Sequence, residues 1–219
     1  MIPNALTLPV RGSPRFDAVL VGGGLHLLAM WLPLVPFVAV AGYLSRVLAA
    51  TAATESHETA ERPDWRPFGP LIRDGLRFVA TAVGYLAIPL VLLLVTLGGP
   101  LEGIDPTGST EGLVFVVGST VATLLAFAIC YPLPAALVAV ARERTLRAAV
   151  DRSLVGAATR DAGYLVATLL AAGGLGLVAA AYGPLNAVAL GFFVGFYAEV
   201  AAAAAIGQAT GRAWRRQGV

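Results

Sequence analysis

Lysine is absent from this sequence of 219 residues, because all 15 of its basic residues are arginine. A phosphate-binding loop that ends in Gly-Lys-Ser or Gly-Lys-Thr is therefore excluded, and so is a Schiff-base lysine. One cysteine and two histidines are too few for a zinc site built from these residues, or for a disulfide framework. We accordingly expect no catalytic residue, no metal and no cofactor.

Charged residues are also scarce. They make up 13% of the chain, whereas hydrophobic residues make up 58%. Soluble globular domains carry about a quarter of their residues as charged side chains. The composition therefore predicts an integral membrane protein whose main partner is the lipid bilayer, and we expect no nucleic-acid partner.

Long apolar stretches divide the chain into membrane-sized segments. A helix rises about 1.5 Å per residue, so about 20 apolar residues cross a hydrocarbon core of about 30 Å. We predict an all-α polytopic helix bundle, a single membrane domain over residues 1–219, with amphipathic cytoplasmic connections. Its six apolar segments are 17–32, 36–50, 76–97, 113–141, 164–185 and 186–207.

The first apolar block, residues 18–50, is too long for one pass and short for two. Pro33 and Pro36 interrupt it, and each proline removes an amide donor and clashes with the preceding turn. We therefore predict a hairpin of two short helices. One long kinked helix is an alternative, because membrane helices tolerate proline. A cleaved signal peptide with Ala-Val-Ala at 39–41 is a third interpretation, which the prolines and the length of the run disfavour.

The positions of the arginines predict the orientation, because basic residues near helix ends stay on the cytoplasmic side. Six passes put all 15 on one side, from Arg11 and Arg15 through two connections to the C-terminal tail. The opposite face then carries only acidic charges: Glu102, Asp105 and Glu111. We predict a multi-pass protein of the cell membrane with both termini in the cytoplasm. The tryptophans are expected as interfacial anchors, two on the inner side and one near the outer: Trp65, Trp214 and Trp31.

The connection over residues 142–161 combines arginines with an apolar stripe. Its apolar residues repeat at helical spacing: Leu146, Val150, Leu154 and Ala157. Three arginines lie largely off that stripe: Arg144, Arg147 and Arg152. The pattern predicts a helix that lies in the membrane interface. In one interpretation the arginines bind anionic lipid headgroups; in the other they only fix the topology.

Glu199 is the one charged residue in the last two apolar segments. An ionisable group near the bilayer midplane costs a few kcal/mol and is a candidate functional residue. One interpretation is a proton or cation site. The alternative is a neutral carboxyl that links helices through a hydrogen bond to one of four polar residues: Tyr85, Ser119, Thr123 and Thr168. His26 is the second candidate, either as a partner of Glu199 or as a histidine bound only to a backbone carbonyl.

Small residues recur at four-residue spacing around Glu199: Gly191, Gly195, Ala203 and Gly207. Such a ridge lets another helix approach closely. We therefore expect Glu199 to point into protein. The last helix is also a candidate surface for a second copy of the chain or for another membrane protein.

Several short motifs point to one family. They are Gly-Tyr-Leu-Ser-Arg-Val at 42–47, Pro-Asp-Trp at 63–65, Asp-Gly-Leu at 74–76, Pro-Ala-Ala-Leu at 134–137, Ala-Arg-Glu at 141–143 and Phe-Tyr at 196–197 with Gly207. From about Asp17 to Trp214 the chain resembles an uncharacterised family of archaeal, halophile-type membrane proteins, domain of unknown function four thousand and thirteen. The resemblance implies a multi-pass membrane protein of unassigned activity, so it transfers no catalytic residue. The Glu-rich insert before Pro63 departs from the family pattern.

The sequence allows three interpretations of the protein's function. We interpret the chain as a non-enzymatic integral membrane protein with a structural or assembly role. The alternative is a small transporter or channel component that uses Glu199. An intramembrane enzyme is a weaker third interpretation, because the sequence offers no paired aspartates, no Ser-His couple and no metal cluster.

Overall fold

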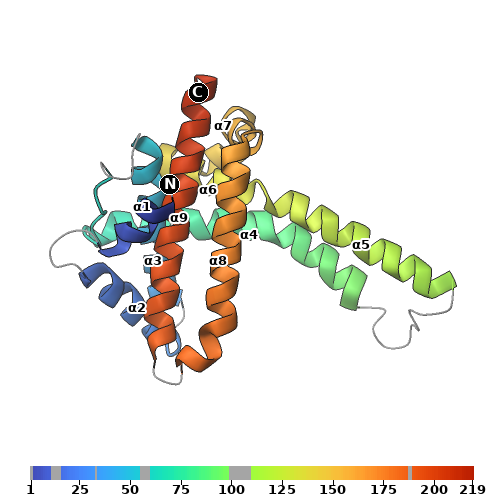
Figure 1. The fold of residues 1–219 in the computed structure, drawn as a ribbon, viewed down its shortest axis with the longest axis horizontal. Coiled ribbons are helices and arrows are strands. Elements are labelled where there is room, and N and C mark those ends of the chain that lie inside the picture. Colours follow the sequence, from blue (N-terminus) through green and yellow to red (C-terminus); the bar gives the residue numbers. More distant parts are fainter. Residues whose placement is uncertain (1, 11–15, 33, 55–59, 99–109, 187–188) are drawn as a thin grey trace.

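The computed structural model describes residues 2–10, 16–32, 34–54, 60–98, 110–186 and 189–219. Within these ranges the chain is helical and has no strand. The elements are α1 (Ile2–Thr7), η1 (Leu8–Val10), α2 (Asp17–Ala29), α3 (Leu34–Ala53), α4 (Phe68–Gly98), α5 (Thr110–Cys130), α6 (Leu133–Glu143), η3 (Leu146–Val150), α7 (Arg152–Thr159), α8 (Ala162–Asn186) and α9 (Leu190–Gln217). The predicted all-α helix bundle is confirmed (Figure 1).

Five helical segments are long and apolar enough to cross a membrane: 34–53, 68–96, 112–143, 162–183 and 190–217. The polytopic architecture is therefore confirmed as well. The sixth predicted segment is the apolar helix α2, whose 13 residues extend for about 20 Å. That length is shorter than a hydrocarbon core of about 30 Å, so α2 alone does not reach across.

The first apolar block is broken in two, as its prolines predict. Helix α2 ends at Ala29, and the amides of Met30 and Trp31 bond to carbonyls of its last turn at 3.3 and 3.0 Å. Helix α3 begins at Leu34 and contains Pro36 in its first turn. A proline is tolerated there, because the amides of the first turn have no acceptor within the helix. The structure therefore has two helices here, which excludes the single kinked helix.

The predicted segment 113–141 is wrong as one continuous helix. Helix α5 ends at Cys130, a turn follows at Tyr131 and Pro132, and α6 begins at Leu133. Two prolines in three residues explain the break, since Pro132 and Pro134 offer no amide to carbonyls of α5 and suit the start of a new helix. Pro89, which stands alone, stays inside α4.

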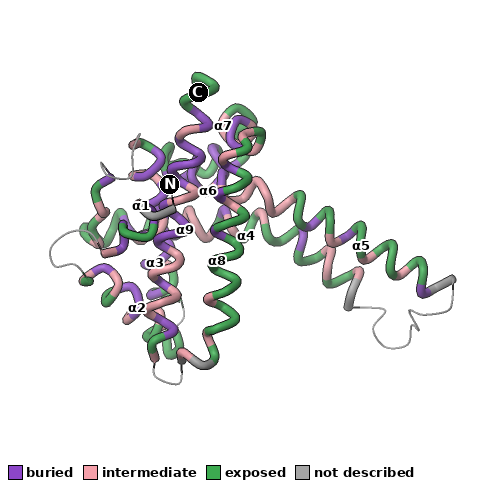
Figure 2. Tube along the Cα trace, in the orientation of Figure 1, coloured by how far each residue is buried: buried purple, intermediate pink, exposed green. Residues whose placement is uncertain are grey.

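Helix α9 is the centre of the bundle and packs against α1, α2, α3, α6, α7 and α8. It runs antiparallel to α8, and its C-terminal end lies beside α7 (Figure 1). Glycines permit the closest approach: a Cβ atom on Gly207 would lie 2.2 Å from the Thr51 hydroxyl oxygen, and one on Gly211 would lie 2.1 Å from the Ala52 carbonyl oxygen. Much of α9 is consequently buried (Figure 2).

Helices α3 and α4 cross at a second pair of glycines. A Cβ atom on Gly42 would lie 2.1 Å from the Leu71 carbonyl oxygen, and one on Gly75 would lie 2.0 Å from the Val38 carbonyl oxygen. The two backbones are thus in direct contact, which no residue with a side chain would permit.

Arg46 fastens the connection between these two helices. Its guanidinium donates to the carbonyl oxygens of Asp64, Arg66 and Pro67 at 2.6, 3.0 and 3.0 Å. Asp74, on α4, lies 4.0 Å from the same guanidinium. The motif residues of 42–47, 63–65 and 74–76 therefore meet at one place in the fold.

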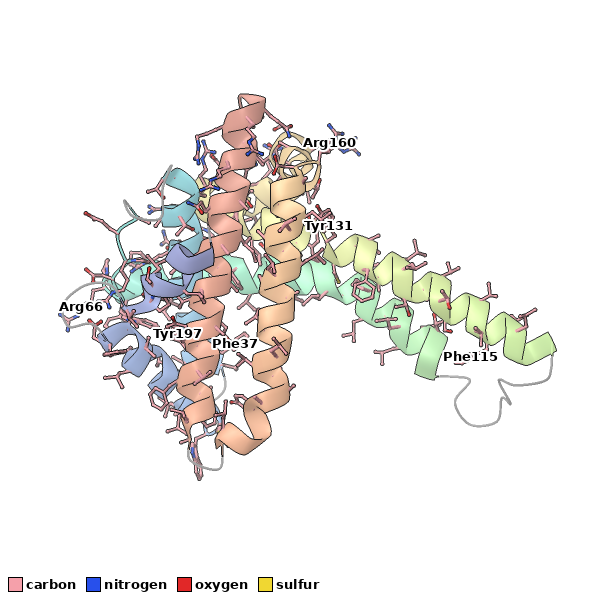
Figure 3. The ribbon with its side chains drawn as sticks, in the orientation of Figure 1. Phe37, Arg66, Phe115, Tyr131, Arg160 and Tyr197 are labelled. Carbon is pink, nitrogen blue, oxygen red and sulfur yellow. The ribbon has the colours of Figure 1, made fainter. Side chains whose placement is uncertain are left out.

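The α4–α5 hairpin leaves the bundle and forms an arm, which we define as residues 83–98 and 110–127. Figure 1 shows the two helices extending side by side away from α8 and α9, and Phe115 lies far out on the arm (Figure 3). Its apolar side chains are exposed, for example Val95 at 72% and Phe127 at 71%. In a membrane protein such a surface faces lipid or another protein.

Several predicted features lie outside the described residues. They are Arg11 and Arg15, the turn at Pro33, the acidic side chains of Glu102 and Asp105, and most of the Glu-rich insert.

Candidate functional site

Glu199 and His26, far apart in sequence, lie side by side where α9 packs against α2. The Nε2 atom of His26 is 3.3 Å from Oε1 of Glu199. The two side chains are 21% and 31% exposed, so the pair lies at the edge of the protein core. Two close contacts bring α2 to this position, since a Cβ atom on Gly22 would collide with the ring of Phe196 and one on Gly23 with the ring of Phe193.

The hydrogen bonds of His26 determine how many protons the pair holds. Its Nδ1 atom is 3.0 Å from the carbonyl oxygen of Gly22, which can only accept, so Nδ1 carries a proton. Two states then satisfy the contact between Nε2 and Oε1. Either imidazolium donates to a carboxylate, or neutral imidazole accepts from a carboxylic acid. In both states one proton is shared and the net charge of the pair is zero.

The predicted hydrogen-bond partners of Glu199 are not the ones found. The Tyr85 hydroxyl donates to the Ala149 carbonyl at 2.6 Å, and Ser119 donates within its own helix. The Thr168 hydroxyl is buried without a hydrogen bond in the described structure. Helix α5 leaves with the arm, which takes Ser119 away from α9. His26, the other candidate, is the residue that contacts the carboxyl group.

An aromatic cluster adjoins the pair and consists of Tyr43, Trp65 and Phe196. The rings of Tyr43 and Trp65 stack with centroids 4.3 Å apart, and Phe196 lies 5.6 and 5.9 Å from them. The His26 ring is 5.9 Å from Phe196. The connection held by Arg46 thus folds back and places the Trp65 indole against α3 and α9, so Trp65 packs on protein; its interfacial location stays a prediction.

A small cavity of about 180 Å³ reaches Glu199 from the side away from α2. Its wall is otherwise apolar and comes from α3, α4, α6, α8 and α9, with Phe78, Leu137 and Leu175 among the lining residues. The second carboxyl oxygen, Oε2, is buried and has no hydrogen-bond partner in the described structure. The cavity thus gives the carboxyl group room but supplies no polar path to it.

The small-residue ridge of α9 is distributed over several neighbours. Gly207 contacts α3, and Gly191 and Ala203 are buried. A Cβ atom on Gly195 would meet only the Tyr182 ring, at 4.0 Å. A ridge at four-residue spacing winds around its helix, and this winding explains why the four residues do not share one partner.

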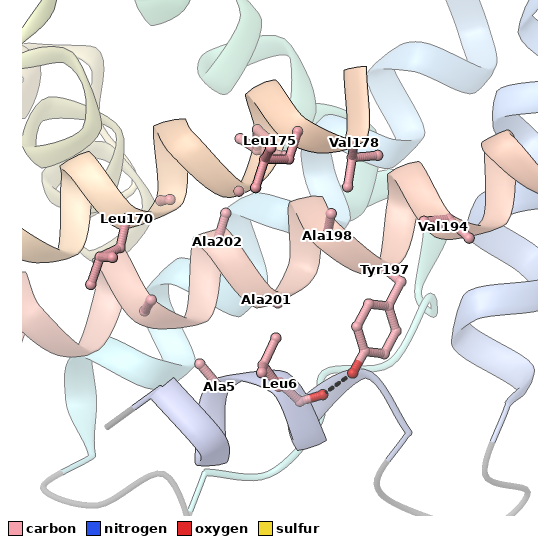
Figure 4. Close-up of a pocket in the computed structure, with 14 residues that line it drawn as sticks. Ala5, Leu6, Leu170, Leu175, Val178, Val194, Tyr197, Ala198, Ala201 and Ala202 are labelled. Atoms are coloured by element: carbon pink, nitrogen blue, oxygen red, sulfur yellow. Dashed lines mark hydrogen bonds between the residues drawn. The ribbon is translucent and has the colours of Figure 1, made fainter. Parts of the chain in front are cut away.

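A second cavity, of about 430 Å³, lies between α1, α8 and α9. Leu6, Leu170 and Leu175 contribute to its apolar wall, and the Tyr197 hydroxyl donates a hydrogen bond to the Leu6 carbonyl across one side (Figure 4). No pattern in the sequence indicates this cavity, because its space is left by alanines on α9 and by Gly174 on α8.

The connection after α6 is not the single interfacial helix that its apolar stripe predicts. Arg144 ends α6 in a left-handed conformation with φ of 55°, η3 follows, and α7 begins only at Arg152. Asp151 caps α7 by accepting hydrogen bonds from the Ser153 amide and hydroxyl at 2.8 and 2.6 Å. These bonds lower the pKa of Asp151 below its ordinary value.

Trp214 also differs from its predicted role as an interfacial anchor. It is 1% exposed, its indole N–H donates to the Leu154 carbonyl at 2.7 Å, and the Arg142 guanidinium lies 5.0 Å from its ring. It therefore joins α9 to α6 and α7 inside the protein. Trp31, at 83% exposure, is the tryptophan that remains on the surface.

Comparison with known proteins identifies a family. A family model described as "Protein of unknown function (DUF4013)" matches residues 25–187. The match includes His26 and the α3–α4 crossing, and it ends before α9 and Glu199. It is shorter at both ends than the likeness expected from Asp17 to Trp214. No curated protein and no solved structure matches the chain.

Proposed function

Because the chain belongs to the family DUF4013, whose function is unknown, we propose a role that rests on its structure: a non-enzymatic, multi-pass protein of the cell membrane that takes part in assembly. The archaeal source expected from the resemblance stays a prediction. The single observation that carries the proposal is the arm.

The arm leaves more helix surface outside the bundle than folding alone requires. Helix α5 packs against α4, and most of the remaining arm surface is apolar and exposed. A chain that needed only to fold would bury one of these helices against α8 or α9. An extended hairpin instead offers two helix faces to a neighbour within the bilayer, where close packing drives association. We place a second copy of the chain on these faces.

The last helix was the surface expected for this contact. Association through α9 stays a prediction, but seven other elements already pack on it, so the arm offers more free surface.

Cross-linking tests the assembly role. We would replace Cys130, the one natural cysteine, with alanine and introduce Leu124→Cys on the arm. The matched control is Leu177→Cys on α8, since the two leucines are 63% and 74% exposed. Oxidation in native membranes should give a covalent dimer with Leu124→Cys and little with Leu177→Cys. Monomers from both variants, in protein that remains inserted, would contradict the proposal.

For the topology we propose six passes with both termini in the cytoplasm. This arrangement keeps all 15 arginines on one side, although the short helix α2 would need a thinned bilayer. Cysteines introduced at Ser13 and Ser109 should react with an impermeant reagent from opposite sides of the membrane. Labelling of both from the same side would refute six passes.

A second candidate function is transport of a proton or cation, and the contact between His26 and Glu199 is the observation that favours it. A shared proton in apolar surroundings is one element of a proton path. Glu199→Gln keeps the shape of the side chain and abolishes its titration. Loss of pH-driven flux in proteoliposomes would support transport, whereas unchanged cross-linking and no flux in either protein would support assembly alone.

The predicted attraction to anionic headgroups is also part of the proposal. Arg144, Arg147 and Arg152 are all exposed, and none of their guanidinium groups forms an ion pair or a hydrogen bond within the described part of the chain.

A further inference from the structure

An open cavity of about 410 Å³ lies where the arm joins the bundle. Its wall comes from α4, the start of α6, the end of η3 and α7, and it includes Tyr85, Pro132, Asp151, Arg152, Thr159 and Arg160. Arg160 lies at the end of α7, on the same side of the molecule as the C-terminus (Figure 3). Unlike the cavities beside Glu199 and α1, this one has a substantially polar wall.

The two arginines of this cavity are uncompensated. In the part of the chain that the structure describes, neither the Arg152 nor the Arg160 guanidinium has an ion pair or a hydrogen bond. The third charge in the cavity is Asp151, whose Oδ1 atom accepts the capping bonds from Ser153 and Leu154. Two guanidinium groups and one carboxylate leave the cavity with one net positive charge.

Asp151 also offers an unused acceptor. All hydrogen bonds of its carboxylate in the described structure involve Oδ1, so Oδ2 is free to accept a further one. Next to it, the hydroxyl groups of Tyr85 and Thr159 donate their protons to backbone carbonyls. The two hydroxyl oxygens can therefore act only as acceptors for a ligand. The cavity therefore combines donors for an anion with acceptors for hydroxyl groups.

Apolar surface adjoins the polar cavity. Val150 lines it and is 73% exposed, and the arm with its exposed valines and leucines starts at the same place. A ligand with a polar head and hydrocarbon chains would match both parts, because guanidinium groups bind phosphate through several hydrogen bonds and the arm covers hydrocarbon.

We propose that this cavity binds the headgroup of an anionic phospholipid that carries free hydroxyls, of the phosphatidylglycerol class. Arg152 and Arg160 hold the phosphodiester, whose single negative charge balances the cavity, and a headgroup hydroxyl donates to Oδ2 of Asp151. The inference rests on the proposed membrane location and deepens the proposed attraction to anionic lipid. It adds Arg160 and Asp151 to the predicted Arg152, and it excludes Arg144 and Arg147 from the site.

Binding of tail-labelled phosphatidylglycerol to the full chain in detergent micelles, followed by fluorescence anisotropy, tests the site. Arg152→Gln and Arg160→Gln should each weaken binding about fivefold, and the double variant about twentyfold or more. The matched control is Arg147→Gln, which removes another exposed and unpaired arginine outside the cavity and should change binding less than twofold. Equal effects of all three single variants would overturn the site.

Two further comparisons test the headgroup chemistry. Phosphatidylmethanol has the same charge but no hydroxyl, and should bind at least threefold more weakly than phosphatidylglycerol. Asp151→Ser keeps a helix-capping residue and removes the acceptor, so it should abolish that preference. Equal binding of the two lipids by the unaltered protein would overturn the role of Asp151.

The source of the phosphate is tested by competition. Glycerol phosphate at the concentration of the lipid should not displace it, and displacement would show that a soluble phosphate ester is the ligand, against the proposal. The Leu124→Cys cross-link, measured in the Arg152→Gln and Arg160→Gln double variant, separates the two proposals. If the double variant loses lipid binding but keeps the cross-link, the assembly proposal holds independently of this site. If lipid binds normally to the unaltered site but no cross-link forms, the assembly proposal is contradicted and the lipid site is not.

Discussion

The α3–α4 crossing makes a quantitative prediction, because the same helix contains a crowded and an open glycine. A Cβ atom on Gly75 would lie 2.0 Å from the Val38 carbonyl oxygen and 3.0 Å from the Gly42 amide nitrogen. A Cβ atom on Gly84 would meet nothing within 4 Å. In Gly75→Ala the two backbones must separate by more than 1 Å, since an ordinary contact between these atoms is about 3.5 Å.

The pair of variants isolates the cost of that separation. Alanine at either position gains up to about 1 kcal/mol of helix propensity, and this gain cancels in the comparison. The difference that remains is the cost of overpacking, about 1–3 kcal/mol. Gly75→Ala should therefore unfold with less free energy than Gly84→Ala by this amount.

Reversible unfolding in mixed micelles, with an increasing fraction of anionic detergent and tryptophan fluorescence as the signal, measures the difference. Trp65 stacks on Tyr43 beside the crossing, so its emission reports on this contact. Gly42→Ala should be equally costly, and the double variant should cost less than the sum, because one separation relieves both collisions. Equal stabilities of Gly75→Ala and Gly84→Ala would show that α3 and α4 do not cross at these glycines.

Three other predictions concern single side chains. Arg46→Gln should lower the free energy of unfolding by about 2 kcal/mol, because three carbonyl oxygens lose a charged donor; Arg46→Lys should recover part of it, and an unchanged transition would contradict the fastening role. Trp214→Phe should cost about 1–2 kcal/mol in the same assay, since the Leu154 carbonyl loses its indole donor, and a silent substitution would argue against that bond. The pKa of Asp151 is lowered in the folded protein, so its stabilising effect is present above the ordinary value of 3.8 and is lost as the pH falls through the lower folded pKa. The melting temperature of the unaltered protein should therefore fall as the pH is lowered through this range, and that of Asp151→Asn should fall less. Identical dependence of the two melting temperatures on pH would contradict the stabilising role of the Asp151 carboxylate.

Hydropathy was sufficient to predict the class of fold and most of its segments. Runs of apolar residues as long as those of α8 and α9 have few alternatives to a membrane helix. Proline placed the break between α2 and α3 correctly. The break before α6 carries the same signal, Pro132 and Pro134, but an uninterrupted apolar run concealed it.

The contacts of the tryptophans could not be predicted, because they depend on where a connection goes in space. Trp65 and Trp214 look like interfacial anchors when only their distance from an apolar segment is considered. Arg46 instead draws the first connection back over Tyr43, and Trp214 finds the Leu154 carbonyl on α7. Local pattern contains no information on such long-range contacts. The sequence Asp151-Arg152-Ser153 is typical of a helix N-cap. Recognising this cap would have placed a helix start within the predicted interfacial helix.

The residues of the candidate site were predicted from the sequence, but their geometry was not. Glu199 and His26 stood out because each is a polar residue in an apolar run, and the possibility that they pair followed from this alone. Their separation and the proton on Nδ1 could come only from the packing of α2 on α9.

That proton has an electrical consequence. Since the imidazole and the carboxyl share one proton and sum to zero charge, a voltage across the bilayer exerts no net force on the couple, and hydrocarbon around it imposes only the cost of a dipole. Adding a second proton to the couple, or removing the shared one, would leave a net unit charge in apolar surroundings. Both changes are therefore unfavourable, and the short helix α2 stays packed on α9 for as long as the couple stays neutral.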